Sequence, residues 1–324
     1  MKLRCAILDD YQGVALDMAD WSRLSPEIEV QVFREKIDGL DNLVRALKDF
    51  EILCLMRERT PIPAKLIEGL PKLRLILSTG GQNLSIDVVA ANQRNITVCG
   101  TSALSHPTVE LTFALMLELA RRAGRESDGM KNGKLWQDSV GMDLCGKTLG
   151  IIGLGRLGTK VAGIAHAFGM RVVAWSPNLT PDKCAEAAVR YATKEQIFSE
   201  ADIVSVHMQL SATTRHIIDA GELACMKRSA LLINTSRGPL INETALLDAL
   251  RKETIAGFGV DVYDEEPLSA DHPFRGLANV VMTPHIGFVT ADNYRTYYGG
   301  AVEGIRAWLD GKPIRIAKPV TNAI

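Results

Sequence analysis

The chain has 324 residues, 47% hydrophobic and 23% charged, with a formal net charge of −1. This is the composition of a globular protein long enough for two domains, and the charge balance does not favour nucleic acid or a membrane as partner. No signal sequence or membrane-spanning apolar run is found, so we expect a cytoplasmic protein. The six cysteines form no C-x-x-C pair, which predicts free thiols and no metal site.

The N-terminal third alternates between strand and helix patterns, which predicts an open α/β domain. Strands are expected at 3–8, 29–33, 51–56, 73–77 and 95–99, and helices at 40–49 and 63–69. A glycine-rich loop with Gly80 and Gly81 follows the fourth of these strands. Its backbone N–H groups could bind an anion, or the loop could be an ordinary turn between strand and helix, and the sequence leaves both open.

A long helix is predicted at 108–122, with apolar residues on nearly every side. The segment 124–146 is polar and irregular, and Trp136 is expected to anchor it to the rest of the protein.

The stretch 147–178 combines a strand at 148–152, a glycine turn, a helix that ends at Gly169 and a second strand at 171–175. Gly153, Gly155 and Gly158 form a G-x-G-x-x-G pattern, in which the first glycine permits the tight turn, the second lets a pyrophosphate approach and the third lets the helix pack closely. N–H groups at the start of the helix, near Arg156 and Leu157, would face the phosphates. The order of these elements predicts a βαβ unit that binds a dinucleotide.

The residue that should follow the second strand of this unit is acidic in typical NAD sites, about 20 residues after the glycines. Ser176 occupies that position here, and the nearest cation is Lys183. Serine would not repel a 2′-phosphate as a carboxylate would. The sequence therefore leaves NAD and NADP both open, with dual use or a preference for NADP among the possibilities.

The rest of the chain alternates again between strands and helices. Strands are predicted at 203–207, 230–234, 256–260 and 280–282, and helices at 194–199, 220–226, 243–252 and 290–310. This pattern predicts a parallel sheet covered by helices on both faces. We expect two α/β units of the Rossmann-like or flavodoxin-like type, with the active site in the cleft between them.

Three polar residues follow three of the later strands, at the ends where α/β sheets bind ligands. They are Arg237, Glu266 and His285. An arginine can hold a carboxylate with two hydrogen bonds, a histidine can donate a proton near neutral pH, and a carboxylate beside it fixes its tautomer and favours the imidazolium. Each could singly have a structural role, but together they predict a hydride-transfer site for a 2-keto or 2-hydroxy acid.

The segments GIIGLGRLG, INTSRGPLIN, GVDVYDEEPL and TPHIG occur in one order along the chain. With them the chain resembles the D-isomer-specific 2-hydroxyacid dehydrogenases, such as glyoxylate and hydroxypyruvate reductases and phosphoglycerate dehydrogenases. The resemblance implies that His285 is the acid/base, that Glu266 supports it and that Arg237 holds the substrate. It implies cofactor contacts beyond the glycine loop and Ser176, at His207, Thr235, Ser236, Asp261 and Gly287.

The same resemblance implies a substrate-binding domain at 1–102 and 290–324, an NAD(P)-binding domain at 103–289, and a homodimer formed through the cofactor domain near helix 108–122. It makes Arg57, Gly80 and Gly81 candidates for substrate binding. The chain departs from the family at Gln82, Leu84, Gln209 and Phe288, which concerns the shape of the substrate pocket. Some relatives, the C-terminal-binding-protein co-repressors, sense dinucleotides as interaction proteins, and this is the alternative function.

Overall fold

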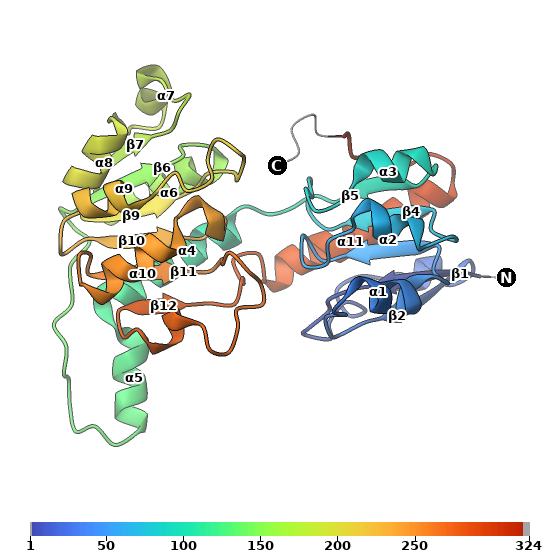
Figure 1. The fold of residues 1–324 in the computed structure, drawn as a ribbon, viewed down its shortest axis with the longest axis horizontal. Coiled ribbons are helices and arrows are strands. Elements are labelled where there is room, and N and C mark those ends of the chain that lie inside the picture. Colours follow the sequence, from blue (N-terminus) through green and yellow to red (C-terminus); the bar gives the residue numbers. More distant parts are fainter. Residues whose placement is uncertain (1, 320–324) are drawn as a thin grey trace. The chain divides into compact units, whose positions relative to one another are not determined.

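The structure is a computed structural model that describes residues 2–319. The chain divides into two compact units, Met1–Leu104 with Val289–Ile324 and Ser105–Phe288. They are called unit 1 and unit 2 below. Each is built on a parallel sheet with helices on both faces, which confirms the predicted α/β class (Figure 1).

Unit 1 contains a five-stranded sheet in the order β2-β1-β3-β4-β5. Its strands are β1 (Leu3–Ile7), β2 (Ile28–Val32), β3 (Ile52–Leu55), β4 (Leu75–Ser78) and β5 (Thr97–Gly100). Its helices are α1 (Leu40–Leu47), α2 (Ala64–Glu68), α3 (Val88–Gln93) and α11 (Ala291–Leu309), with a 3-10 turn at Trp21–Leu24. Strands β3 and β4 are buried throughout, because α11 from the C-terminal segment packs on this sheet. The loops after β3 and β4 carry Arg57 and Gly80.

Unit 2 contains a seven-stranded sheet in the order β12-β11-β10-β9-β6-β7-β8. The strands are β6 (Thr148–Ile152), β7 (Arg171–Trp175), β8 (Arg190–Tyr191), β9 (Ile203–Val206), β10 (Leu231–Asn234), β11 (Gly257–Val260) and β12 (Val280–Met282). The helices are α4 (His106–Arg121), α5 (Ala123–Lys131), α6 (Arg156–Ala167), α7 (Pro181–Glu186), α8 (Lys194–Glu200), α9 (Ala220–Cys225) and α10 (Glu243–Arg251), with 3-10 turns at Gly238–Leu240 and Pro273–Gly276.

The strand order of unit 2 reverses between β6 and β9, which is the switch point where α/β sheets bind ligands. Every strand pair is parallel, so the carboxyl ends of β6, β9, β10, β11 and β12 share one edge of the sheet. Two apolar cores cover its faces, one under α8, α9 and α10 and the other under α4 and α6. This arrangement places the glycine turn and the residues after each strand along a common edge.

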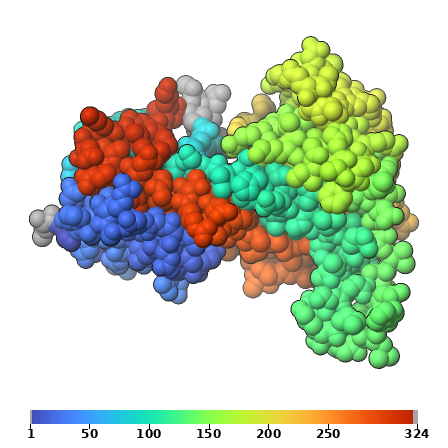
Figure 2. Space-filling view, turned by 180° about the vertical axis from the view of Figure 1, so that it is seen from behind, coloured from blue at the N-terminus to red at the C-terminus, as the bar shows by residue number. Residues whose placement is uncertain are grey.

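The segment 124–146 differs from its prediction. It begins with helix α5, which has no buried residue and therefore lacks the apolar periodicity by which a helix is recognised. Trp136 is 70% exposed and is not an anchor, and its neighbours Leu135 and Val140 are 96% and 97% exposed. Figure 2 shows this green segment extending away from the rest of unit 2. The short elements α3, α7 and β8 were also not predicted.

The six cysteines are all free thiols, two of them exposed. Among residues 2–319, no group of histidine, cysteine or acidic side chains could hold a metal ion. No helix in that part of the chain has the length and apolar character needed to cross a membrane.

His207 follows β9 directly, beside the glycine turn. Its Nε2 shares a hydrogen bond of 2.8 Å with the Ser205 hydroxyl, and its Nδ1 is buried without a hydrogen-bond partner in the described chain. Burial disfavours the charged ring and lowers the pKa of His207 to about 4. The folded protein therefore keeps this histidine neutral at pH values where an unfolded chain would protonate it.

We predict that His207 makes unit 2 sensitive to acid. An unfolded histidine binds its proton near pH 6.5 and the folded one only near pH 4, so stability is complete above pH 6.5 and is lost as the pH falls towards 4. The loss should reach about 3 kcal/mol, or roughly 6–12 °C in Tm. Calorimetry of the cofactor-free protein should show a shallower decline of Tm in His207→Gln than in the wild type. Equal slopes would contradict the assignment, and exposed His166→Gln is the control.

Candidate active site

The turn between β6 and α6 has the geometry of a phosphate cradle. Gly153 has a φ of 102°, and a Cβ there would lie 2.6 Å from the carbonyl oxygen of His207, so this position requires glycine. A Cβ at Gly155 would meet nothing within 4 Å, which is the open approach that a pyrophosphate needs. Helix α6 starts at Arg156 without a side-chain cap, so the N–H groups of its first turn can bind an anion. These residues fit a dinucleotide.

Asn234, the last residue of β10, organises the loop that carries Arg237. Its Oδ1 accepts a 3.0 Å hydrogen bond from the Ser236 N–H, and its Nδ2 donates one of 2.9 Å to the Arg237 carbonyl. The Ser236 hydroxyl donates to the Val206 carbonyl at 2.8 Å, and the Thr235 hydroxyl shares a 2.9 Å bond with Thr112 on α4. The loop is therefore tied to β9 and α4, and Arg237 is presented from a rigid base.

Asp261 follows β11 and is buried. Its Oδ1 accepts hydrogen bonds from the Thr283 hydroxyl (2.6 Å) and the Ile286 N–H (2.8 Å), and its Oδ2 accepts one from the Gly287 N–H (2.8 Å). Burial raises the pKa of Asp261, although these bonds oppose the rise. Asp261 thus joins the end of β11 to the loop after β12, on both sides of His285. This positioning role was not foreseen from the sequence.

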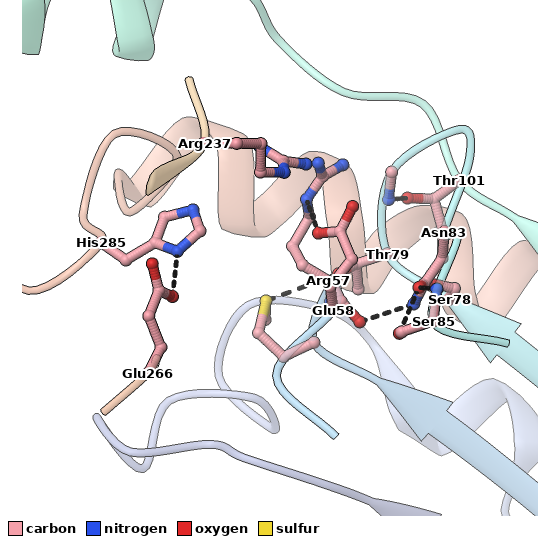
Figure 3. Close-up of polar contacts among 12 residues, drawn as sticks. Arg57, Glu58, Ser78, Thr79, Asn83, Ser85, Thr101, Arg237, Glu266 and His285 are labelled. Atoms are coloured by element: carbon pink, nitrogen blue, oxygen red, sulfur yellow. Dashed lines mark hydrogen bonds and ion pairs between the residues drawn. The ribbon is translucent and has the colours of Figure 1, made fainter. Parts of the chain in front are cut away.

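Glu266 and His285 are joined by a hydrogen bond of 2.6 Å between Oε2 and Nδ1 (Figure 3). The other carboxylate oxygen accepts a 2.9 Å bond from the Tyr263 N–H. Burial opposes ionisation of Glu266, but the hydrogen bond and charge of His285, the Tyr263 N–H and the charge of Arg237 together hold its pKa below the usual value. Glu266 is therefore an anionic acceptor, and because it engages Nδ1, Nε2 is the nitrogen of His285 that can act on a ligand.

The His285 ring is held by further contacts. Phe288 packs on it in a T-shaped arrangement, with ring centroids 5.4 Å apart and an interplanar angle of 75°. The backbone of His285 has a φ of 53°, a left-handed conformation that non-glycine residues adopt infrequently. The Tyr263 hydroxyl donates 2.8 Å to the Thr283 carbonyl and fixes the start of the same loop. Phe288, one of the positions at which the chain departs from the family pattern, thus contacts the ring of His285, the predicted acid/base.

In unit 1, the loops after β3 and β4 form a second cluster of predicted residues. The Gly80 N–H donates a 2.8 Å hydrogen bond to the Thr101 hydroxyl, so this N–H has a structural partner and is not offered to an anion. Gly80 has a φ of 85°, and a Cβ there would clash with the guanidinium of Arg57. A Cβ at Gly81 would meet nothing within 4 Å. The glycine at position 80 therefore makes room for Arg57.

Arg57 is held by both its backbone and its side chain. Its N–H donates to the Thr79 hydroxyl at 3.0 Å and its carbonyl accepts from Asn83 Nδ2 at 2.7 Å. Its Nε lies 3.4 Å from an oxygen of Glu58, an ion pair between adjacent residues that Figure 3 shows. Its φ of 55° is left-handed, as at His285.

Sequence reasoning missed several residues that position the site, chiefly Asn234, Tyr263, Thr283 and Glu58. Asn234 and Thr283 could have been suspected, because each is a short polar residue at or just after the end of a strand, where side chains bond to the loop backbone. Tyr263 holds Glu266 through its backbone N–H, a contact that no residue type reveals.

Comparison with known proteins places these features in a family. The sequence model described as "D-isomer specific 2-hydroxyacid dehydrogenase, NAD binding domain" matches residues 113–287. A glyoxylate reductase of Aeropyrum pernix is 36% identical over 260 residues, covering 78% of this chain and 78% of the relative. A hydroxypyruvate reductase of Thermotoga maritima is 35% identical over 285 residues, covering 86% and 91%.

Solved structures agree with these matches. A phosphoglycerate oxidoreductase of Vibrio cholerae is 34% identical, with a TM-score of 0.91 over 95% of this chain and 99% of that chain. The fold, the glycine cradle and the sequence matches lead to one conclusion. The chain belongs to the D-isomer specific 2-hydroxyacid dehydrogenase family and is an enzyme that uses a nicotinamide dinucleotide.

Proposed function

We propose that this protein reduces a small 2-keto acid to the D-2-hydroxy acid, with His285 as the acid/base. The observation that carries the proposal is the 2.6 Å hydrogen bond between Glu266 and His285. The relatives named glyoxylate reductase and hydroxypyruvate reductase support small 2-keto acids as substrates. When bound, the reduced nicotinamide supplies a hydride to the keto carbon.

His285 delivers the proton that the reaction needs. In reduction, the N–H at Nε2 gives its proton to the keto oxygen as that oxygen becomes a hydroxyl, and in oxidation the same nitrogen accepts it. Glu266 accepts the hydrogen bond from Nδ1 and therefore fixes the tautomer and the ring orientation. Asp261 and Phe288 keep the loop and the ring in place.

Arg237 binds the substrate carboxylate in this proposal. A guanidinium presents five N–H donors in a planar fork, which matches a carboxylate and an adjacent carbonyl oxygen. One nitrogen, Nη1, donates to the Ser236 carbonyl at 2.7 Å and orients the fork. Residues 103–289 are assigned to cofactor binding. Residues 1–102 with 290–324 are assigned to substrate binding through Arg57 and Gly81, with Gly80 making room for the Arg57 guanidinium.

We predict that His285→Gln lowers kcat for keto-acid reduction by about 10²–10⁴-fold, because glutamine cannot transfer the proton. The Kd for NADH, measured by fluorescence titration, should change little, since the glycine cradle is untouched. Steady-state kinetics on glyoxylate and hydroxypyruvate provide the test. The exposed His166→Gln on α6 is the matched control. Turnover of His285→Gln close to the wild-type value would remove His285 from the mechanism.

We also propose that the protein accepts NADP as well as NAD. Ser176 stands half-buried at the end of β7, where a carboxylate would repel a 2′-phosphate. The Lys194 ammonium lies 5.9 Å from the centroid of the neighbouring Trp175 ring and pairs with Glu222 at 2.7 Å. Ser176 is itself neutral and therefore contributes no negative charge that would repel the 2′-phosphate.

We predict that Ser176→Asp lowers kcat/KM for NADPH at least about tenfold while kcat/KM for NADH is maintained or rises, because the new charge repels only the 2′-phosphate. Initial rates with both cofactors at one keto-acid concentration provide the measurement. Ser199→Asp on α8 adds the same charge elsewhere in unit 2 and should change neither value. A wild type that already rejects NADPH would refute the proposal.

The protein is also proposed to be a homodimer formed through unit 2. Helix α4, suggested by the sequence as part of the interface, packs mostly inside its own unit, with Val109, Phe113 and Met116 buried. Exposed apolar side chains lie instead on the segment after α5, at Leu135, Trp136 and Val140. Apolar surface of this kind is typical of protein interfaces.

We predict that the wild type sediments at twice the mass of the chain and that Leu135→Asp with Val140→Asp shifts it to the monomer. Burying these side chains would stabilise the dimer, whereas buried carboxylates would oppose it. Analytical ultracentrifugation at micromolar concentration is the measurement, with the exposed Leu16→Asp of unit 1 as control. A monomeric wild type would contradict the proposal.

A further inference from the structure

The loop that follows β3 in unit 1 contains two arginines, Arg57 and Arg59, and each has a different partner. The Arg59 guanidinium lies 4.5 Å from the centroid of the Tyr11 ring, and its Nη1 donates to the Asp9 carbonyl at 3.0 Å. Asp9 is buried and accepts a 2.7 Å bond from the Thr60 hydroxyl. Arg59 is therefore part of the structure that joins this loop to the end of β1.

Arg57 is the arginine of this loop that can bind a ligand, and the neighbouring carboxylate of Glu58 balances its charge. Its Nε lies 3.4 Å from the Glu58 carboxylate. The side chains are 21% and 26% exposed, so both ions can be reached by a small molecule but are only partly screened by water. The backbone bonds to Thr79 and Asn83 hold the turn, and Gly80 gives the guanidinium its place. A ligand that approaches Arg57 therefore also approaches the carboxylate of Glu58.

The paired charges determine which chemical groups fit beside Arg57. A phosphate dianion or a second carboxylate would gain attraction from the arginine and lose a comparable amount to repulsion by the glutamate, since the two lie within one ion-pair distance. A hydroxyl can accept a hydrogen bond from the guanidinium and donate one to the carboxylate. The Arg57–Glu58 pair therefore disfavours a substrate that carries a second anionic group beside its carboxylate, and it is compatible with a neutral polar group at that place.

We infer that Glu58 is a specificity-determining residue that makes this enzyme select monoanionic 2-keto acids, such as glyoxylate or hydroxypyruvate, over phosphorylated or dicarboxylic ones. The inference rests on the proposed function, because it takes Arg57 as a substrate-binding residue. The inference distinguishes between two classes of relative. The chain is similar, at nearly the same identity, to reductases of small keto acids and to a phosphoglycerate oxidoreductase.

The experiment compares hydroxypyruvate with 3-phosphohydroxypyruvate, which differ in one phosphate. The wild type should show a kcat/KM at least about tenfold higher for hydroxypyruvate, and Glu58→Gln should narrow that ratio about tenfold, mainly through a lower KM for the phosphorylated acid. The wild-type preference should also shrink at high salt, which screens the repulsion. Exposed Glu68→Gln at the end of α2 removes the same charge elsewhere in unit 1 and should leave the ratio unchanged.

A wild type that prefers the phosphorylated acid, or an unchanged ratio in Glu58→Gln, overturns the inference while leaving keto-acid reduction intact. A second measurement does not depend on turnover. Titration calorimetry of D-glycerate and 3-phosphoglycerate into the protein with NADH, with which these hydroxy acids cannot react, should show that Glu58→Gln tightens the binding of only the phosphorylated ligand. Failure to reduce any keto acid would refute the proposed function. The calorimetric test of Glu58 would remain: an unchanged ratio between the Kd values of the two ligands in Glu58→Gln would overturn its role.

Discussion

The hydrogen bond between Glu266 and His285 is the interaction on which the remainder of the site depends. The two residues are 19 positions apart and follow different strands, so the bond forms only because β11 and β12 are parallel neighbours. Asp261 joins the same two strand ends through three hydrogen bonds, and Tyr263 holds Glu266 through its N–H. The sheet therefore sets the geometry of the acid/base, and the loops refine it.

Much of the fold was predictable because it follows from local pattern. Strands β6 and β7 begin and end at the predicted residues, since parallel strands buried on both faces are continuous apolar runs bounded by polar or glycine residues. Arg237, Glu266 and His285 could be singled out because parallel strands end at one edge of the sheet. Helix α5 could not be predicted, because none of its residues is buried and it therefore shows no apolar pattern. The N–H of Gly80 could not be assigned either, because its partner, Thr101, is 21 residues away.

Charge balance separates the roles of the arginines. The positive charge of Arg237 is among the influences that keep Glu266 ionised, whereas Arg57 is matched by its neighbour Glu58. The sequence showed all of these residues but not their pairing, because adjacent residues in a turn can point in different directions. The left-handed backbones of Arg57 and His285 are likewise features of the folded chain alone, and both occur in loops that follow a strand.

The measurement that tests the account most directly is reduction of 2-keto acids by the purified protein, followed through nicotinamide absorbance and by the configuration of the product. Glyoxylate, pyruvate and hydroxypyruvate would be supplied with NADH or NADPH. The account predicts rapid oxidation of the cofactor by at least one acid and, from the chiral products, only the D-isomer. Tight cofactor binding without turnover of any of these acids would contradict it and would favour a dinucleotide-sensing interaction protein.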